Sequence, residues 1–185
     1  ESPTLCGDVL EIIAGPDEHD QSTVSGSPDR DAVQIIGVPR SCRQELRNPQ
    51  VLAALEDTVG QLTDLGYRVV DVDFATLRYA AAAYYVISCA EASANLARFD
   101  GVRYGARTSG ESADETIIAS RSDGFGDEVK LRVLAGTYVL RSGFHDRYYL
   151  RAQKVRTALR DELAGLFGQI DLLLMPVYPV PPFAR

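Results

Sequence analysis

The sequence predicts an α/β fold, a mixed sheet flanked by helices. Two apolar runs with strand character, residues 34–39 and 67–74, flank a helical pattern that begins at Asn48-Pro49. A strand, a helix and a strand at this spacing form a βαβ unit, which implies a parallel or mixed sheet. A third apolar run, IDLLLM at 170–175, follows a long amphipathic pattern. We expect one α/β domain segment over residues 1–185.

The first predicted helix has clear start and stop signals. Ser2 suits the N-cap, Pro3 suits the first helical position, and Gly15 ends an apolar face that starts at Leu5. Residues 16–31 are rich in Asp, Ser, Gly and Pro, which predicts an exposed loop. The run QIIGVP at 34–39 then predicts a short buried strand.

The second predicted helix is capped in the same way, by Asn48 before Pro49. Its apolar positions step along one face to Leu65, and Gly66 stands where a left-handed residue ends a helix. The β-branched alternating run YRVVDVDF at 67–74 predicts the next strand.

The second half of the chain is predicted to be mostly helical. Helical spacing covers residues 77–97 and 127–142, and an apolar stripe from Tyr148 to Phe167 predicts a long helix that ends near Gly168. The strand IDLLLM would be buried and would end at the four prolines that follow it. It would also be a terminal edge of the sheet. A sheet of three strands that ends at an edge, in a chain that starts at Glu1, is expected to be part of a larger protein.

Composition excludes several functional classes. The 26 acidic and 19 basic residues give a net charge of −7, which argues against a general binder of nucleic-acid backbones. Three unpatterned cysteines predict free thiols in a reducing cytoplasm and suggest no metal site. No run of about 18 apolar residues predicts a membrane span.

Familiar catalytic motifs are absent from the sequence, including G-x-S-x-G, Walker A and H-E-x-x-H. The two histidines have ordinary interpretations: solvation for His19 in its acidic loop, and packing or a surface hydrogen bond for His145. Lys130 and Lys154 are the two lysines, and neither stands beside a serine cluster.

Three segments carry a specific resemblance: YYVISCAEASANLARFDGVRYG at 84–105, SRSDGFGDEVKLR at 120–132 and GTYVLRSGFHDRYYLRAQKVRTALRDEL at 136–163. Together they resemble the A subunits of the bacterial glutamyl-tRNA(Gln)/aspartyl-tRNA(Asn) amidotransferases, within the amidase signature family. The resemblance extends over nearly the whole chain. It departs at GFHDRYY, in the short stretch after Ser22, and at Leu131, where the family has a second arginine.

The resemblance implies that the catalytic residues lie elsewhere. The family uses a Lys-Ser-Ser triad in a Gly/Ser-rich segment that precedes the region matched here. No such segment occurs in the 185 residues, so we expect no catalytic residue and no activity from the isolated chain. The serine-bearing loop matches a stretch after the family's catalytic core and is not assigned a nucleophile; its residues are Ser22, Thr23, Ser25 and Ser27.

For this segment the resemblance implies substrate recognition. Arg132 matches the arginine that pairs with the α-carboxylate of glutamine, and Tyr84 matches a tyrosine of the same pocket, with Tyr85 as the alternative register. A planar guanidinium binds a carboxylate through two parallel hydrogen bonds. The alternatives are a solvated helix position or a salt bridge to Glu128 for Arg132, and a core position for Tyr84. The family's acidic residue for the glutamine amine would lie beyond Arg185.

Other polar groups have structural interpretations. Glu91, Asn95 and Arg98 share a helix face and predict a hydrogen-bond network, while GFG at 124–126 is either a flexible turn near the glutamine pocket or a helix-start turn. The basic residues near the end of the chain predict a solvated helix face: Arg147, Arg151, Lys154, Arg156 and Arg160.

The resemblance implies a cytoplasmic glutaminase subunit of a tRNA-dependent amidotransferase. It would supply ammonia from glutamine to amidate Glu-tRNA(Gln) or Asp-tRNA(Asn), in complex with B and C subunits. This chain would bind no cofactor; ATP, Mg and the mischarged tRNA would be bound by the partner subunit. The alternatives are a stand-alone amidase that hydrolyses small amides and a catalytically dead scaffold paralogue.

Overall fold

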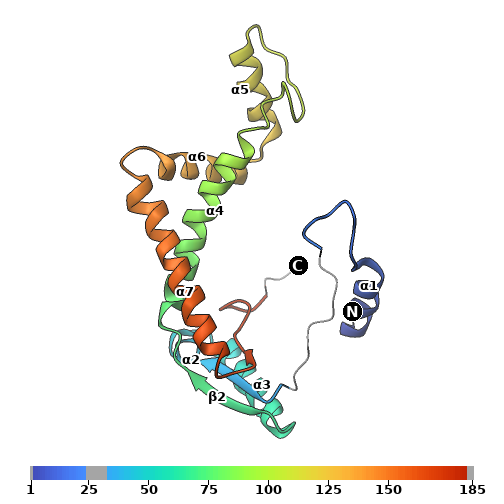
Figure 1. The fold of residues 1–185 in the computed structure, drawn as a ribbon, viewed down its shortest axis with the longest axis vertical. Coiled ribbons are helices and arrows are strands. Elements are labelled where there is room, and N and C mark those ends of the chain that lie inside the picture. Colours follow the sequence, from blue (N-terminus) through green and yellow to red (C-terminus); the bar gives the residue numbers. More distant parts are fainter. Residues whose placement is uncertain (1, 24–32, 183–185) are drawn as a thin grey trace. The chain divides into compact units, whose positions relative to one another are not determined.

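The structure, a computed structural model, describes residues 2–23 and 33–182. The chain forms two compact units, Glu1–Val33 and Gln34–Arg185. Figure 1 labels most of the elements in both units. The organisation of residues 1–185 as a single domain stays a prediction. In chain order the elements are α1 (Pro3–Ile13), β1 (Ile35–Pro39), α2 (Arg40–Glu45), α3 (Pro49–Asp64), β2 (Arg68–Val72), the 3₁₀ helix η1 (Ala75–Tyr79), α4 (Ala80–Leu96), α5 (Ala113–Gly124), α6 (Asp127–Leu140), the π-helix η2 (Asp146–Leu150), α7 (Arg151–Phe167) and β3 (Leu172–Leu173).

The first unit contains α1 and the loop after it. The Ser2 hydroxyl accepts a hydrogen bond from the Thr4 N–H at 3.1 Å, so the predicted cap is confirmed. The described part of the loop is almost entirely exposed, as predicted, and Asp20 accepts hydrogen bonds from the backbone and hydroxyl of Ser22. Ser25 and Ser27 lie outside the described residues.

The second unit is built on a three-stranded sheet with the order β2-β1-β3, in which both pairings are parallel. The α/β fold class is confirmed. Ile36 and Val38 of the central strand are buried, and the Asp171 carboxylate accepts hydrogen bonds at 2.8 Å from the N–H groups of Gln34 and Ile35. This carboxylate therefore ties the approach to β3 to the start of β1.

The edge position of β3 is confirmed, but its predicted extent and burial are wrong. The strand pairs only over Leu172–Leu173, and Leu172 is 47% exposed and Met175 39% exposed. Ile170, which precedes the strand, is buried. The proline-rich sequence after Met175 cannot supply the N–H groups that a longer ladder needs.

The βαβ unit follows its sequence signals closely. Asn48 caps α3 by accepting hydrogen bonds from the N–H groups of Gln50 and Val51, and Gly66 has the predicted left-handed φ of 93°. The predicted apolar stripe is only partly buried, since Leu55 is 5% exposed whereas Leu65 is 74% exposed. The strand β2 is shorter than the predicted run 67–74.

The helices of the second unit form a layer in which α4 packs on both α6 and α7. Small side chains are buried in this layer, among them Ala83, Ala90 and Ala152. Helix α4 starts three residues later than predicted because η1 precedes it. The Glu162 carboxylate of α7 holds η1 by accepting hydrogen bonds from the N–H groups of Ala75 and Thr76.

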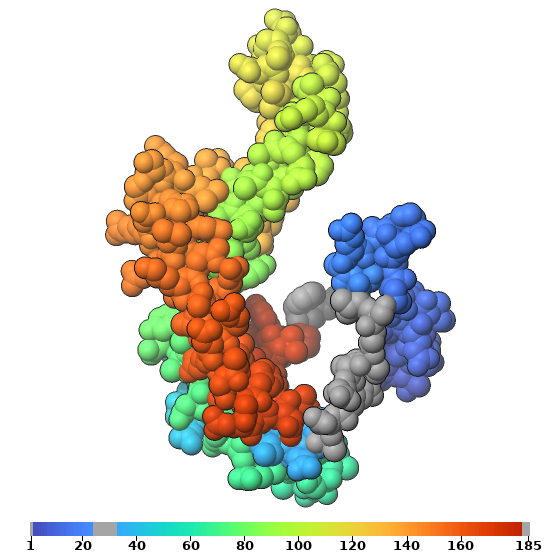
Figure 2. Space-filling view, in the orientation of Figure 1, coloured from blue at the N-terminus to red at the C-terminus, as the bar shows by residue number. Residues whose placement is uncertain are grey.

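A lobe that comprises residues 97–124 lies at the C-terminal end of α4 and contains α5, a helix that the sequence did not predict. Figure 2 shows it in yellow and yellow-green beyond α4. Its buried side chains include Thr116 and Ser120, and the Arg121 guanidinium donates to the carbonyls of Leu96 and Phe99 at 2.8 and 3.0 Å. We call it the α5 lobe.

The predicted long helix has an irregular start. Residues Asp146–Leu150 form the π-helix η2, and the α-helical part begins at Arg151. Within residues 2–23 and 33–182, none of the helices combines the length and the apolar composition of a membrane span.

Candidate functional site

The two predicted substrate-binding residues lie on facing helices. Tyr84 is in the second turn of α4 and Arg132 is in the second turn of α6. These two helices form the most extensive helix–helix contact of the second unit. The structure therefore brings together two residues that are far apart in the sequence.

A close backbone approach between α4 and α6 sets the geometry of this pair. Gly136 stands one turn after Arg132 on α6, and it is buried against the Cys89 carbonyl of α4. Beside it, the hydroxyls of Ser93 and Thr137 lie 2.9 Å apart. With no side chain on Gly136, the helices come close enough for Tyr84 and Arg132 to be neighbours.

The guanidinium of Arg132 is already engaged on one edge. Its Nε donates to Glu128 Oε1 at 2.9 Å, which is the salt bridge that the sequence offered as an alternative. Glu128, and after it the Tyr84 hydroxyl, raise the pKa of Arg132 above its ordinary value. The Arg132 side chain is 34% exposed and keeps its charge at every physiological pH.

Tyr84 does not occupy a core position in the described chain. Tyr84 and Tyr85 are 58% and 57% exposed, and their rings meet edge to face with centroids 5.6 Å apart. The two rings present one aromatic surface, and of the two tyrosines it is Tyr84 whose hydroxyl lies beside Arg132. Either tyrosine, Tyr84 or Tyr85, is therefore accessible to a ligand.

The predicted network of Glu91, Asn95 and Arg98 takes another form. The Glu91 carboxylate accepts a hydrogen bond from the Tyr149 hydroxyl at 2.7 Å, which joins α4 to η2. The Arg98 Nε donates to the Asn95 backbone carbonyl at 3.0 Å. These bonds stabilise helix packing and a helix end, so the expected structural role is confirmed, but the described hydrogen bonds do not link the three side chains into one network.

Both histidines have the ordinary roles that the sequence indicated. The His19 side chain is 87% exposed, beside Glu18. His145 makes a surface hydrogen bond with Asp146 at 3.0 Å and lies against the Tyr149 ring. The three cysteines are free thiols, as predicted: Cys6, Cys42 and Cys89.

The turn GFG joins two helices. Phe125 caps the C-terminus of α5 and Gly126 is the N-cap of α6, so the helix-start interpretation is confirmed. The predicted solvated basic face is also confirmed, since five basic residues near the end of the chain are exposed: Arg147, Arg151, Lys154, Arg156 and Arg160.

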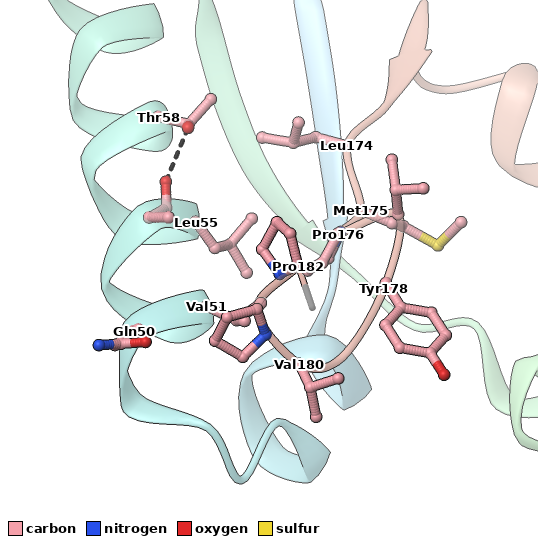
Figure 3. Close-up of a pocket in the computed structure, with 13 residues that line it drawn as sticks. Gln50, Val51, Leu55, Thr58, Leu174, Met175, Pro176, Tyr178, Val180 and Pro182 are labelled. Carbon is pink, nitrogen blue, oxygen red and sulfur yellow. Dashed lines mark hydrogen bonds between the residues drawn. The ribbon is translucent and has the colours of Figure 1, made fainter. Parts of the chain in front are cut away.

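A large apolar groove lies elsewhere in the second unit, between α3 and residues 174–182. It has a volume of about 1020 Å³, and Figure 3 shows Val51 and Leu55 of α3 facing the proline-rich segment. Its described lining contains no charged side chain. The groove therefore offers no charged side chain to a ligand, whereas the site beside Tyr84 offers the Arg132 guanidinium.

Sequence comparisons agree with the resemblance. The chain is 39% identical over 182 residues to the A subunit of the glutamyl-tRNA(Gln) amidotransferase of Methanosarcina barkeri, and the match covers 95% of this chain and 38% of that protein. It is 43% identical over 183 residues to the corresponding protein of Chloroflexus aurantiacus, which has the same name, with the same coverage. The chain thus spans less than half the length of these relatives.

Structural comparison gives the same fold. The crystal structure of the A subunit of the Thermotoga maritima glutamyl-tRNA(Gln) amidotransferase matches with a TM-score of 0.62 at 30% identity, over 96% of this chain and 36% of that one. A crystal structure described as an amidase matches with a TM-score of 0.57 at 23% identity, over 80% of this chain and 29% of that one. The amidase family model matches residues 6–185, and the chain belongs to the amidase family.

Proposed function

We propose that this segment forms the glutamine-recognising part of a glutaminase subunit of a tRNA-dependent amidotransferase. The observation that supports the proposal is the pair of Arg132 and Tyr84 on facing helices, in a chain similar to amidotransferase A subunits. The guanidinium binds the α-carboxylate of glutamine, and the tyrosine hydroxyl adds a hydrogen bond on the same side.

The activity belongs to the full-length subunit that carries this segment. A Lys-Ser-Ser triad elsewhere in that subunit would cleave the side-chain amide of glutamine and release ammonia. Cytoplasmic B and C subunits, with ATP and Mg on the partner subunit, would use the ammonia to amidate Glu-tRNA(Gln) or Asp-tRNA(Asn). The isolated 185-residue chain would hydrolyse no glutamine.

The test is the Arg132→Ala variant of the full-length subunit, assembled with its partner subunits. Each charge-assisted hydrogen bond contributes about 1.5 kcal/mol or more, so the loss of two should raise KM for glutamine roughly 100-fold. Arg132→Lys should recover part of the loss, because lysine keeps the charge but not the two parallel bonds. An unchanged KM in Arg132→Ala would overturn the proposal.

The competing candidate is a stand-alone amidase of small uncharged amides, with which the match to the amidase family model is also consistent. An uncharged amide offers no carboxylate to Arg132. Equal hydrolysis of glutamine and of simple amides by the full-length protein would favour this candidate. A scaffold paralogue would hydrolyse neither substrate.

A further inference from the structure

We infer that Glu128 is a positioning residue for substrate recognition: it holds the Arg132 guanidinium by its Nε edge and leaves the opposite edge to the substrate carboxylate. The inference rests on the proposed role of Arg132 in glutamine binding. The salt bridge between Arg132 and Glu128 would then support the binding of a ligand and would not compete with it.

The first support is the local geometry of α6. Glu128 precedes Arg132 by four residues, the order in which an acid and a base pair best on a helix, and Nε and Oε1 are 2.9 Å apart. Glu128 also lies in the first turn of α6, where the helix dipole favours a carboxylate. The bond is therefore well placed to form before any ligand arrives.

The second support is the donor set of arginine. A guanidinium has one Nε–H donor and four Nη–H donors in a planar fork. When Glu128 accepts from Nε, the four Nη–H donors remain, enough for the neighbouring Tyr84 hydroxyl and for two parallel bonds to a second carboxylate. The Nε bond also fixes the plane of the fork, so less side-chain freedom is lost when the ligand binds.

A competing effect is repulsion between Glu128 and the substrate carboxylate. The Glu128 side chain is 69% exposed, so water and salt screen its charge, whereas the hydrogen bond to Arg132 is direct. Orientation should therefore outweigh repulsion. If orientation of Arg132 dominates, removal of Glu128 raises KM. If repulsion of the substrate carboxylate dominates, removal of Glu128 lowers KM.

The experiment uses the full-length subunit with its partner subunits and measures ammonia release from glutamine and from its α-methyl ester, which lacks the charged carboxylate. Glu128→Ala should raise KM for glutamine about 10-fold, the factor expected for one charge-assisted bond, with kcat within about twofold. KM for the ester should not change. Glu128→Gln, which keeps an acceptor oxygen, should limit the rise to about threefold.

Asp127 provides the matched control. It lies in the same first turn of α6, its side chain is fully exposed, and it faces Lys130 at 3.8 Å. Asp127→Ala should leave KM unchanged for both substrates. Its thermal unfolding is the reference with which that of Glu128→Ala is compared.

The outcomes separate this inference from the proposed function. If Arg132→Ala raises KM while Glu128→Ala leaves it unchanged or lowers it, the positioning role is wrong and the proposed function stands. If Glu128→Ala raises KM equally for the ester, the effect is structural and the positioning role is again wrong. If Arg132→Ala leaves KM unchanged, the proposed function itself fails.

Discussion

Gly136 of α6 lies directly against the backbone carbonyl of Cys89 in α4. A Cβ atom on Gly136 would overlap the Cys89 oxygen and would be 2.7 Å from the Ser93 Cβ. Both approaches are well inside van der Waals contact, so no side chain fits unless the helices move apart. The distance between the helices that carry Tyr84 and Arg132 therefore depends on this glycine.

The first prediction concerns Gly136→Ala. The added methyl group must push α6 away from α4, and overpacking of this kind costs typically about 1–3 kcal/mol in the free energy of unfolding. Chemical denaturation of the chain measures the loss. Gly165→Ala is the control, since Gly165 is in α7 with open space around it, and it should be neutral or stabilising by less than about 1 kcal/mol. Equal stability of the two variants would contradict the close packing.

This contact also shows what the sequence could predict and what it could not. Caps are local signals, and both Ser2 and Asn48 act as the sequence indicated. Arg132 and Tyr84 were identified by resemblance. Their proximity could not be predicted, because it depends on the approach of Gly136 to a distant helix.

Hydrophobic periodicity gives no signal for the α5 lobe, although Ser112 and Glu115 have the spacing of a capping box and the Ser112 hydroxyl caps α5. Its buried positions include Thr116 and Ser120, so no apolar stripe repeats along α5. Hydrophobic periodicity is the main signal for a helix, and a polar core hides it. The sequence predicts a longer strand than β3, because an apolar run does not reveal where the backbone hydrogen bonds to the neighbouring strand end.

The second prediction concerns Ser120 in the α5 lobe. Its hydroxyl is buried, accepts from the Thr108 N–H at 2.9 Å and donates to the Thr108 carbonyl at 3.2 Å. Ser120→Ala leaves both backbone groups without this partner, which should cost about 1–3 kcal/mol of local stability. Hydrogen exchange of the Thr108 amide should accelerate, while Ser122→Ala, at an exposed position of α5, should leave it unchanged. Equally slow exchange of the Thr108 amide in both variants would show that the Ser120 hydroxyl does not hold the backbone at Thr108.

The third prediction concerns the loss of stability in acid when the Glu162 carboxylate is protonated. Hydrogen bonds from the Thr76 hydroxyl, and then from the N–H groups of Thr76 and Ala75, lower the pKa of Glu162 from 4.5. A lowered folded-state pKa gives stability that is full above pH 4.5 and is lost as pH falls through the folded value. Asp171, whose pKa is also lowered, acts in the same direction from 3.8 downward. The free energy of unfolding should therefore fall as the solution is acidified below about pH 4.5.

Glu162→Gln tests the contribution of this carboxylate. At pH 7 it should lower the free energy of unfolding by about 1 kcal/mol, a value that allows for solvent screening of a partly exposed group. The difference from the unmodified chain should shrink as the pH falls below about 4.5. Asp161→Asn, at the exposed neighbouring position beside Arg160, should cost less than about 0.5 kcal/mol. A difference that does not depend on pH would mean that Glu162 acts through packing and not through its charge.

The last prediction decides which tyrosine belongs to the substrate site. Tyr84 and Tyr85 have nearly equal exposure and touch each other, but the Tyr84 hydroxyl is the one that raises the pKa of Arg132. Phenylalanine keeps each ring and its edge-to-face contact and removes only the hydroxyl. Tyr84→Phe in the full-length protein should raise KM for glutamine about 3- to 10-fold, the range for one hydrogen bond to a ligand, and Tyr85→Phe should not. Because both variants keep the aromatic surface, a general loss of packing would change them equally. The reverse result, with the effect confined to Tyr85→Phe, would shift the register of the substrate site by one residue and place the tyrosine contact away from the guanidinium.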